Sequence, residues 1–273
     1  MPPVFSGWLR RRFLGASFAS LLVAVAPASA QDMEVDLELV LAVDVSHSMD
    51  FEEQEVQRQG YIAGLTHPEI QTAIGSGYLG RIAVTYVEWA GPGSHAVVVP
   101  WTLIDGLESA QAFVTQLDGT EVSRLRGTSI SSAISFTSGL FEGNGYQAMR
   151  QVIDVSGDGP NNMGSPVLDA RAAALEKDIT INGLPIMLHT RYDGMFSIGD
   201  LDVYYENCVI GGPGAFLVTV ETIDRLAEAI RRKLVLEIAG LPARIVPAQL
   251  FPDVRPDYDC MIGERLRRRW IVE

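Results

Sequence analysis

The length, charge and composition of the chain indicate one sizeable domain and exclude several kinds of partner. The chain has 273 residues and a formal net charge of −13, and a domain of roughly 200 residues is large enough to bury a substantial core. A charge excess of this sign argues against nonspecific binding to nucleic acid and against docking on anionic lipid.

The first thirty residues have the three parts of a secretory leader. Residues 10–12 are arginines, residues 13–26 are apolar, and residues 28–30 read Ala-Ser-Ala, which matches a cleavage site. The arginine run also resembles a twin-arginine signal, so the general and the twin-arginine export routes both stay open. We expect a signal peptide over residues 1–30, no membrane span, and an exported protein that is periplasmic or extracellular.

The first half of the remaining chain alternates strand-like and helix-like segments. Residues 37–43 form an almost continuous apolar run, which is typical of a strand buried on both faces. Residues 50–53 resemble a capping box that begins a helix to about residue 65. The segments 81–90 and 95–101 are joined by a Gly-Pro-Gly turn, which predicts an antiparallel hairpin at a sheet edge.

The second half continues the alternation, with helices expected at residues 107–117, 130–141, 166–177, 200–206 and 222–238, and strands at 149–156, 179–186 and 215–220. The last helix carries Arg231, Arg232 and Lys233, which we place on its solvated side. We predict an α/β fold with a doubly wound, mostly parallel sheet, one antiparallel edge strand and helices on both faces. It occupies residues 31–240, and the Pro-rich residues 241–273 form an extension on its surface.

Hard oxygen donors follow the apolar strand at 37–43. Asp44, Ser46 and Ser48 come at the carboxyl end of this strand, where open α/β sheets place their ligands. Because Mg²⁺ requires about six oxygens, other loops must contribute, and Thr128 at a helix start and Asp158 between two glycines are the candidates. The alternative is that Asp44 and Thr128 cap helices while both serines fill a turn.

This combination resembles the metal-ion-dependent adhesion site of von Willebrand factor A domains. In that family a DxSxS loop, a threonine and an aspartate hold one divalent cation. The resemblance covers residues 35–239, and the stretches 87–93, 158–162 and 209–214 are similar to an uncharacterised bacterial subgroup, a domain of unknown function. It implies Mg²⁺ as the ion, with Mn²⁺ or Ca²⁺ as alternatives. It also implies a protein or peptide partner whose Asp or Glu carboxylate occupies the open coordination position.

The third loop departs from the family pattern. Asp154 lies inside the strand, and there is one more residue before the turn. We expect Asp154 and Ser156 to support the metal ligands from behind; the alternative for Asp154 is pairing with a neighbouring loop. His47 is expected at the rim of the site, since hard-oxygen sites do not require imidazole.

The two cysteines, Cys208 and Cys260, predict one disulfide if the protein is exported, and two separate thiols are the alternative. Such a bond would attach the tail to the long loop that contains Cys208.

The leading functional hypothesis is a binding module without catalytic residues. Phosphatases with an aspartate nucleophile after a strand need a second acid two residues on, and position 46 is a serine. Serine hydrolases need a Gly-x-Ser-x-Gly turn, which the sequence lacks. The alternatives are a periplasmic domain in which the metal only stabilises the fold, and a metal-dependent hydrolase.

Overall fold

The computed structural model describes residues 32–188, 197–240 and 258–272 of the chain. The predicted signal peptide and the Pro-rich segment 241–257 lie outside the described residues. Among the helices of the described ranges, none is long and apolar enough to cross a membrane.

A five-stranded sheet in the order β4-β3-β2-β6-β7 forms the centre of the domain. β2 (Leu37–Asp44) lies in the middle and pairs in parallel with β3 (Ile82–Trp89) and β6 (Gln151–Gly157). β7 (Thr180–Pro185) extends the parallel arrangement beyond β6, and β4 (His95–Ile104) pairs antiparallel with β3 at the other edge. The predicted mostly parallel sheet with one antiparallel edge strand is confirmed.

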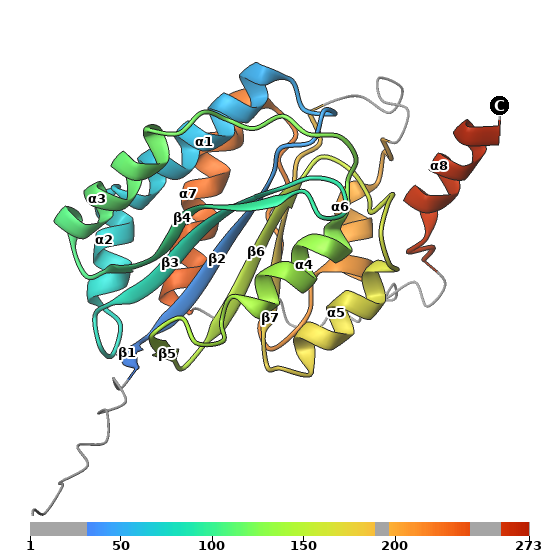
Figure 1. Cartoon of the computed structure of the whole chain (residues 1–273). Coiled ribbons are helices and arrows are strands. Elements are labelled where there is room, and N and C mark those ends of the chain that lie inside the picture. The colour runs from blue at the N-terminus through green and yellow to red at the C-terminus, as the bar shows by residue number, and fades with distance from the viewer. Residues whose placement is uncertain (1–31, 189–196, 241–257, 273) are drawn as a thin grey trace, which may run out of the picture. The chain divides into compact units, whose positions relative to one another are not determined.

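Helices cover both faces of this sheet (Figure 1). One layer contains α1 (Phe51–Leu65), α2 (Pro68–Gly75), α3 (Leu107–Asp118) and α7 (Ile223–Ala239). The opposite layer contains α4 (Ile130–Gly139), α5 (Val167–Leu175), α6 (Leu201–Tyr204) and the π-helix η1 (Tyr205–Val209). Outside the main sheet, β1 (Met33–Val35) pairs in parallel with β5 (Tyr146–Ala148).

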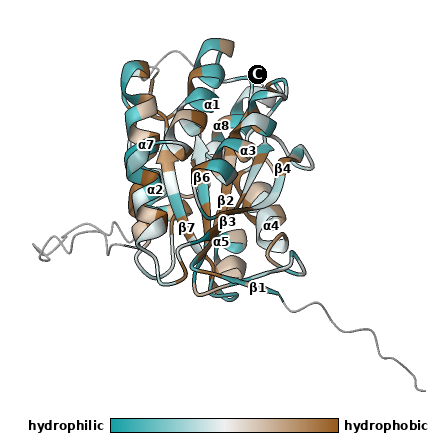
Figure 2. Ribbon diagram, turned by 90° about the vertical axis from the view of Figure 1, so that its left-hand side faces the viewer, coloured by the Kyte–Doolittle hydropathy of each residue, from teal (hydrophilic) through white to brown (hydrophobic). Residues whose placement is uncertain are grey.

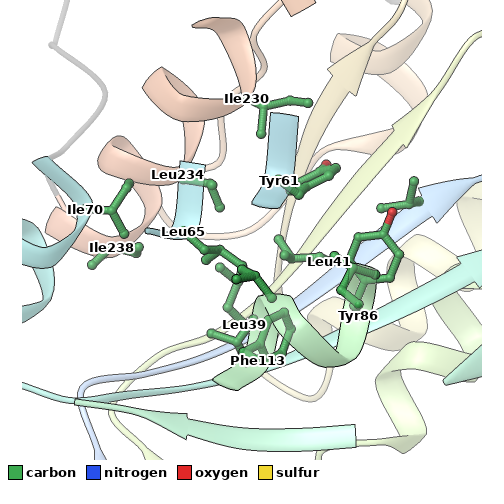
Figure 3. Close-up of a cluster of buried hydrophobic side chains, with 14 of the residues drawn as sticks. Leu39, Leu41, Tyr61, Leu65, Ile70, Tyr86, Phe113, Ile230, Leu234 and Ile238 are labelled. Carbon is green, nitrogen blue, oxygen red and sulfur yellow. The ribbon is translucent and has the colours of Figure 1, made fainter. Parts of the chain in front are cut away.

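The side chains of β2 explain its central place. All eight of its residues are buried, and alternate residues of a strand point to opposite faces. Leu39 and Leu41 pack in the cluster that contains Tyr61 and Leu65 of α1 (Figure 3), whereas Val40 belongs to the cluster on the α4 side. Figure 2 shows hydrophobic residues along the central strands, with helices that contain both hydrophilic and hydrophobic residues on either side.

The start of α1 is fixed by the predicted capping box. The backbone N–H of Glu53 donates to Asp50 Oδ1 at 2.8 Å, and the backbone N–H of Asp50 donates to Glu53 Oε2 at 2.9 Å. These reciprocal bonds satisfy two N–H groups that a helix start leaves without partners. The capping box therefore fixes where the loop after β2 ends and α1 begins.

The predicted strand at residues 215–220 is only partly correct. This segment runs beside β7 and forms isolated parallel bridges, Gly183 with Leu217 and Ile186 with Val220, instead of a continuous strand. Pro185 of β7 has no backbone N–H to donate, and its carbonyl accepts from the N–H of Val220 at 3.0 Å. The ladder is therefore interrupted between the two bridges.

Two further differences concern charged segments. Lys233 is not solvated as predicted: it is 1% exposed and pairs with Asp154 and Glu237. The end of the tail also contains a helix that the proline pattern concealed, α8 (Ile262–Val272). The environment of Lys233 is formed by a distant strand, which helical periodicity does not reveal.

Candidate metal centre

The first loop of the predicted site leaves the carboxyl end of β2. Asp44 is fully buried, and its Oδ1 accepts a hydrogen bond from the backbone N–H of Ser46 at 2.7 Å. Gln54 of α1 donates from Nε2 to the carbonyl of Ser46 at 3.1 Å, which fixes the loop against the helix. His47 and Ser48 are exposed, so His47 lies at the rim.

The third loop, after β6, meets the first loop through hydroxyl groups. Ser48 Oγ donates to Asp158 Oδ1 at 2.7 Å, and Ser46 Oγ and Ser48 Oγ share a hydrogen bond of 2.7 Å. Asp158 is partly exposed. The structure thus brings Asp158 and the two serines into one hydrogen-bonded cluster, and Asp44 is next to Ser46.

The second loop carries Thr128 and lies against both other loops. The N–H of Leu125 donates to the carbonyl of Val45 at 3.0 Å, beside the first loop. The N–H of Thr128 donates to Asn162 Oδ1 at 3.2 Å, and its carbonyl accepts from the N–H of Asn162 at 2.9 Å. The Thr128 side chain does not cap α4; that N-cap is Ser129. The hydroxyl of Thr128 makes no hydrogen bond within the described residues.

The electrostatics of this cluster fit a cation. The pKa of Asp44 is raised well above its usual range, first by burial and then by the negative charge of Asp158. Asp44 Oδ2 is buried and has no hydrogen-bond partner among the described residues. A buried carboxylate oxygen without a partner is unfavourable, and a cation beside it relieves both this cost and the repulsion from Asp158. Two carboxylates and three hydroxyls form a hard-oxygen set that suits Mg²⁺.

The described residues contain no group of three or more His, Cys, Asp or Glu side chains that could hold a metal ion. The candidate site has only two carboxylates, so its remaining ligands would be the hydroxyls of Ser46, Ser48 and Thr128. Hard oxygens of this type do not favour soft metals, which prefer sulfur and imidazole.

Sequence reasoning did not identify Tyr205, which belongs to η1. The Tyr205 hydroxyl and Asp44 Oδ2 both lie 2.9 Å from the point that a Cβ on Gly157 would occupy, so only glycine fits there. The Tyr205 hydroxyl is also buried without a hydrogen-bond partner in the described part of the chain. π-Helical turns are rare and often occur at functional sites. No local sequence signal marks this tyrosine, because the turn brings it to the site from a distant segment.

The residues expected to support the ligands, Ser156 and Asp154, have different partners. Ser156 Oγ accepts from Gln57 Nε2 of α1 at 2.9 Å, directly below the third loop. Asp154 is 1% exposed and its Oδ1 lies 2.6 Å from Nζ of Lys233 on α7. The partner of Asp154 is therefore a helix residue, and not a residue of a neighbouring loop. No contact between Asp154 and the proposed metal ligands is found among the described residues.

Asn161 and Asn162, at the end of the third loop, connect it to the start of α4. Besides the bonds between Asn162 and Thr128, Asn161 Oδ1 accepts from the N–H of Ser131 at 3.0 Å. The N–H of Asn161 donates to the Tyr204 hydroxyl at 3.1 Å. These contacts hold the second and third loops in a fixed relation to each other.

The predicted disulfide is present. Cys208 of η1 and Cys260 of the tail are bonded, and Cys208 is fully buried in the core on the α4 side of the sheet. The described residues contain no free cysteine.

The comparisons with known proteins agree with the fold. A model of the family described as "Protein of unknown function (DUF1194)" matches residues 34–242. None of the curated proteins matches the sequence.

Solved structures with the same fold include adhesion and matrix proteins. The pilus adhesin SpaC from Lactobacillus rhamnosus GG is 15% identical with a TM-score of 0.55, over 76% of this chain and 31% of that chain. Proximal thread matrix protein 1 from the mussel byssus, with a zinc-occupied MIDAS motif, is 14% identical with a TM-score of 0.56. The match covers 77% of this chain and 49% of that chain. A von Willebrand factor type A protein from Catenulispora acidiphila is 15% identical with a TM-score of 0.50, and the match covers 75% of this chain and 43% of that chain. The chain spans less than half of each of these proteins, and its fold is that of a von Willebrand factor A domain.

Proposed function

The chain belongs to the DUF1194 family, and we propose that it is an exported binding module that holds a divalent cation, with Mg²⁺ as the first choice, and uses it to bind a carboxylate of a protein or peptide. The residues proposed to hold the ion are Asp44, Ser46, Ser48, Thr128 and Asp158. The ion supplies a positive charge with an open coordination position, and the chain supplies the oxygens that orient it.

The observation that carries this proposal is the buried Asp44 Oδ2. It has no hydrogen-bond partner among the described residues and lies close to a second carboxylate, Asp158. Three hydroxyl-bearing residues from two loops lie around the same sheet edge. A protein of the same fold holds zinc in the corresponding kind of motif, which supports metal binding by this fold without identifying the ion here.

Binding is favoured over catalysis because the cluster lacks a pair of acid and base positioned for proton transfer. Asp44 hydrogen-bonds the backbone of Ser46, and Asp158 accepts from Ser48. A metal-dependent hydrolase and a domain in which the metal only stabilises the fold remain the alternatives. Export is supported by the disulfide between Cys208 and Cys260, since disulfides persist in oxidising compartments.

A peptide titration tests the proposal. Two fluorescein-labelled peptides of Gly and Ser, one with a central Glu and the other with Gln in its place, are titrated with the protein in Mg²⁺ and in chelator. We expect fluorescence anisotropy to rise only for the Glu peptide and only in Mg²⁺, because the neutral amide gains less from a cation. Equal binding of both peptides, or binding that survives the chelator, would contradict the proposal. If Mg²⁺ raises the melting temperature while neither peptide binds, the structural-metal alternative is correct.

A further inference from the structure

The tail helix α8 contacts the third loop of the candidate metal centre. Glu264 Oε1 accepts a hydrogen bond of 2.6 Å from Nδ2 of Asn161, and both residues are buried. Gly263 lies so close that a Cβ on it would be 2.2 Å from the carbonyl oxygen of Asn161. Only glycine permits this approach, so the start of α8 fits closely against the loop that carries Asp158.

Covalent and packing contacts hold this end of the helix in place. Cys260, two residues before α8, is bonded to the buried Cys208. Tyr258 and Ile262 pack against the same core cluster, and Arg265 pairs with Asp259. The first turn of α8 is therefore anchored beside the metal site by contacts that do not depend on the segment 241–257.

The next turn of α8 carries three positive charges that have no acidic partner among the described residues. Arg267, Arg268 and Arg269 are consecutive, and Arg268 and Arg269 are exposed. Unlike Arg265, none of the three makes a hydrogen bond or ion pair with the described residues. The whole chain has a net charge of −13, so three consecutive arginines make this turn positive in a protein that is negative as a whole. Arg126, in the loop before Thr128, adds another exposed arginine near the site.

The span between the two features suits one extended peptide. Asn161 comes three positions after Asp158, at most about 11 Å of chain, and Arg269 comes five positions after Glu264, roughly 8 Å of helix. With the contact and side-chain lengths added, the arginines lie within about 30 Å of Asp158, which an extended segment of about nine residues covers.

We infer that the arginine-bearing turn of α8 is a second contact for the partner that places a carboxylate on the metal, so that the protein selects acidic polypeptide segments with several carboxylates over segments with one. This inference rests on the proposed function and specifies its partner. Arginine pairs with carboxylates through two parallel N–H bonds. Two linked contacts bind more tightly than either contact alone, because the second one forms within the complex.

Charge complementarity favours an acidic polypeptide over an anionic bilayer. A bilayer would meet the whole face around α8 of a strongly acidic protein, and the remaining negative charge would oppose docking. A short peptide meets only the metal site and the nearby arginines. The bilayer is therefore the competing outcome of the test.

The test uses the full mature protein and two labelled peptides of about nine residues, one with Glu at every position and one with a single Glu among Gly and Ser. The α8 variant is Arg268→Gln with Arg269→Gln. The matched control is Arg225→Gln with Arg232→Gln, which removes the same charge from two exposed arginines of α7. We expect the many-carboxylate peptide to bind the wild type and the control about three- to tenfold more tightly than the single-Glu peptide in Mg²⁺. The α8 variant should lose this gain and keep its affinity for the single-Glu peptide.

The possible results separate the two proposals. An unchanged preference for the many-carboxylate peptide in the α8 variant would overturn the inference. An unchanged preference together with lost binding to phosphatidylglycerol vesicles would assign the arginines to a bilayer instead. If neither peptide depends on Mg²⁺ but the α8 variant still weakens the many-carboxylate peptide, the proposed metal function fails while the α8 contact stands.

Discussion

A buried group of three charges joins α7 to the central sheet. Lys233 Nζ lies 2.6 Å from Asp154 Oδ1 and also pairs with Glu237, one turn along the same helix. Asn182 of β7 donates to Glu237 Oε1 at 3.0 Å. One lysine faces two carboxylates, so the group carries excess negative charge when both are ionised. Burial, and then the charge of Asp154, raise the pKa of Glu237 from 4.5 to about 7.

This raised pKa predicts a pH dependence of folding stability. Between about pH 4.5 and 7 the folded protein keeps a proton on Glu237 that the unfolded chain releases. The protonation of Glu237 therefore contributes fully to the free energy of unfolding below the unfolded pKa. This contribution is lost as the pH rises through the folded pKa, and the free energy of unfolding falls by at most about 1.4 kcal/mol per pH unit. In Glu237→Gln, which can still accept from Asn182, this fall should disappear. Urea unfolding of wild type and variant across this range measures it; parallel stability curves would contradict the assignment.

At the scale of elements, the sequence predicted the sheet because β2 is an unbroken apolar run and the turns are marked by glycine and proline. The convergence of Asp44 and Asp158 then followed from parallel strands that end at one edge. Lys233 was misplaced because its partner, Asp154, lies on a strand nearly eighty residues earlier, and helical periodicity does not reveal such pairs. An aspartate inside an apolar strand was the available signal that a buried cation faces it.

The tail helix was missed for a different reason. The prolines before it indicate irregular structure, and they obscured the spacing of Ile262, Leu266 and Trp270, which repeats every four residues as on one face of a helix. The cysteine pairing was predictable because the chain has only two cysteines. The contact of Glu264 with Asn161 was not, since it depends on where the disulfide places the tail.

The disulfide that attaches the tail predicts a measurable contribution to the free energy of unfolding of the protein. The bond closes a sequence separation of 52 residues, which corresponds to about 4 kcal/mol in the chain-entropy model. The double variant Cys208→Ser with Cys260→Ser should unfold at lower denaturant by roughly that free energy. Reductant should destabilise the wild type similarly and leave the double variant unaffected. A double variant as stable as the oxidised wild type would show that the bond does not constrain the unfolded chain.

At the scale of the whole molecule, the candidate centre joins three loops that are far apart in the sequence. The first follows β2, the second precedes α4 and the third follows β6. α8 adds a fourth segment through Glu264. A ligand that binds the folded site and not the unfolded chain stabilises the entire fold by mass action, about 2.7 kcal/mol at a concentration one hundred times its Kd. Metal binding should therefore be visible as a global gain in stability.

The most direct test of the central claim is calorimetric titration of Mg²⁺ into the wild type, Asp44→Asn, Asp158→Asn and the control Asp169→Asn, an exposed residue on α5. Both site variants should lose about tenfold or more in affinity, because each removes one of two charged ligands, while the control binds as the wild type does. Asp44→Asn should fold normally without metal, since burial of an ionised Asp44 is itself unfavourable. Far-ultraviolet circular dichroism checks that the variants are folded. Unchanged Mg²⁺ affinity in both folded site variants would contradict the account.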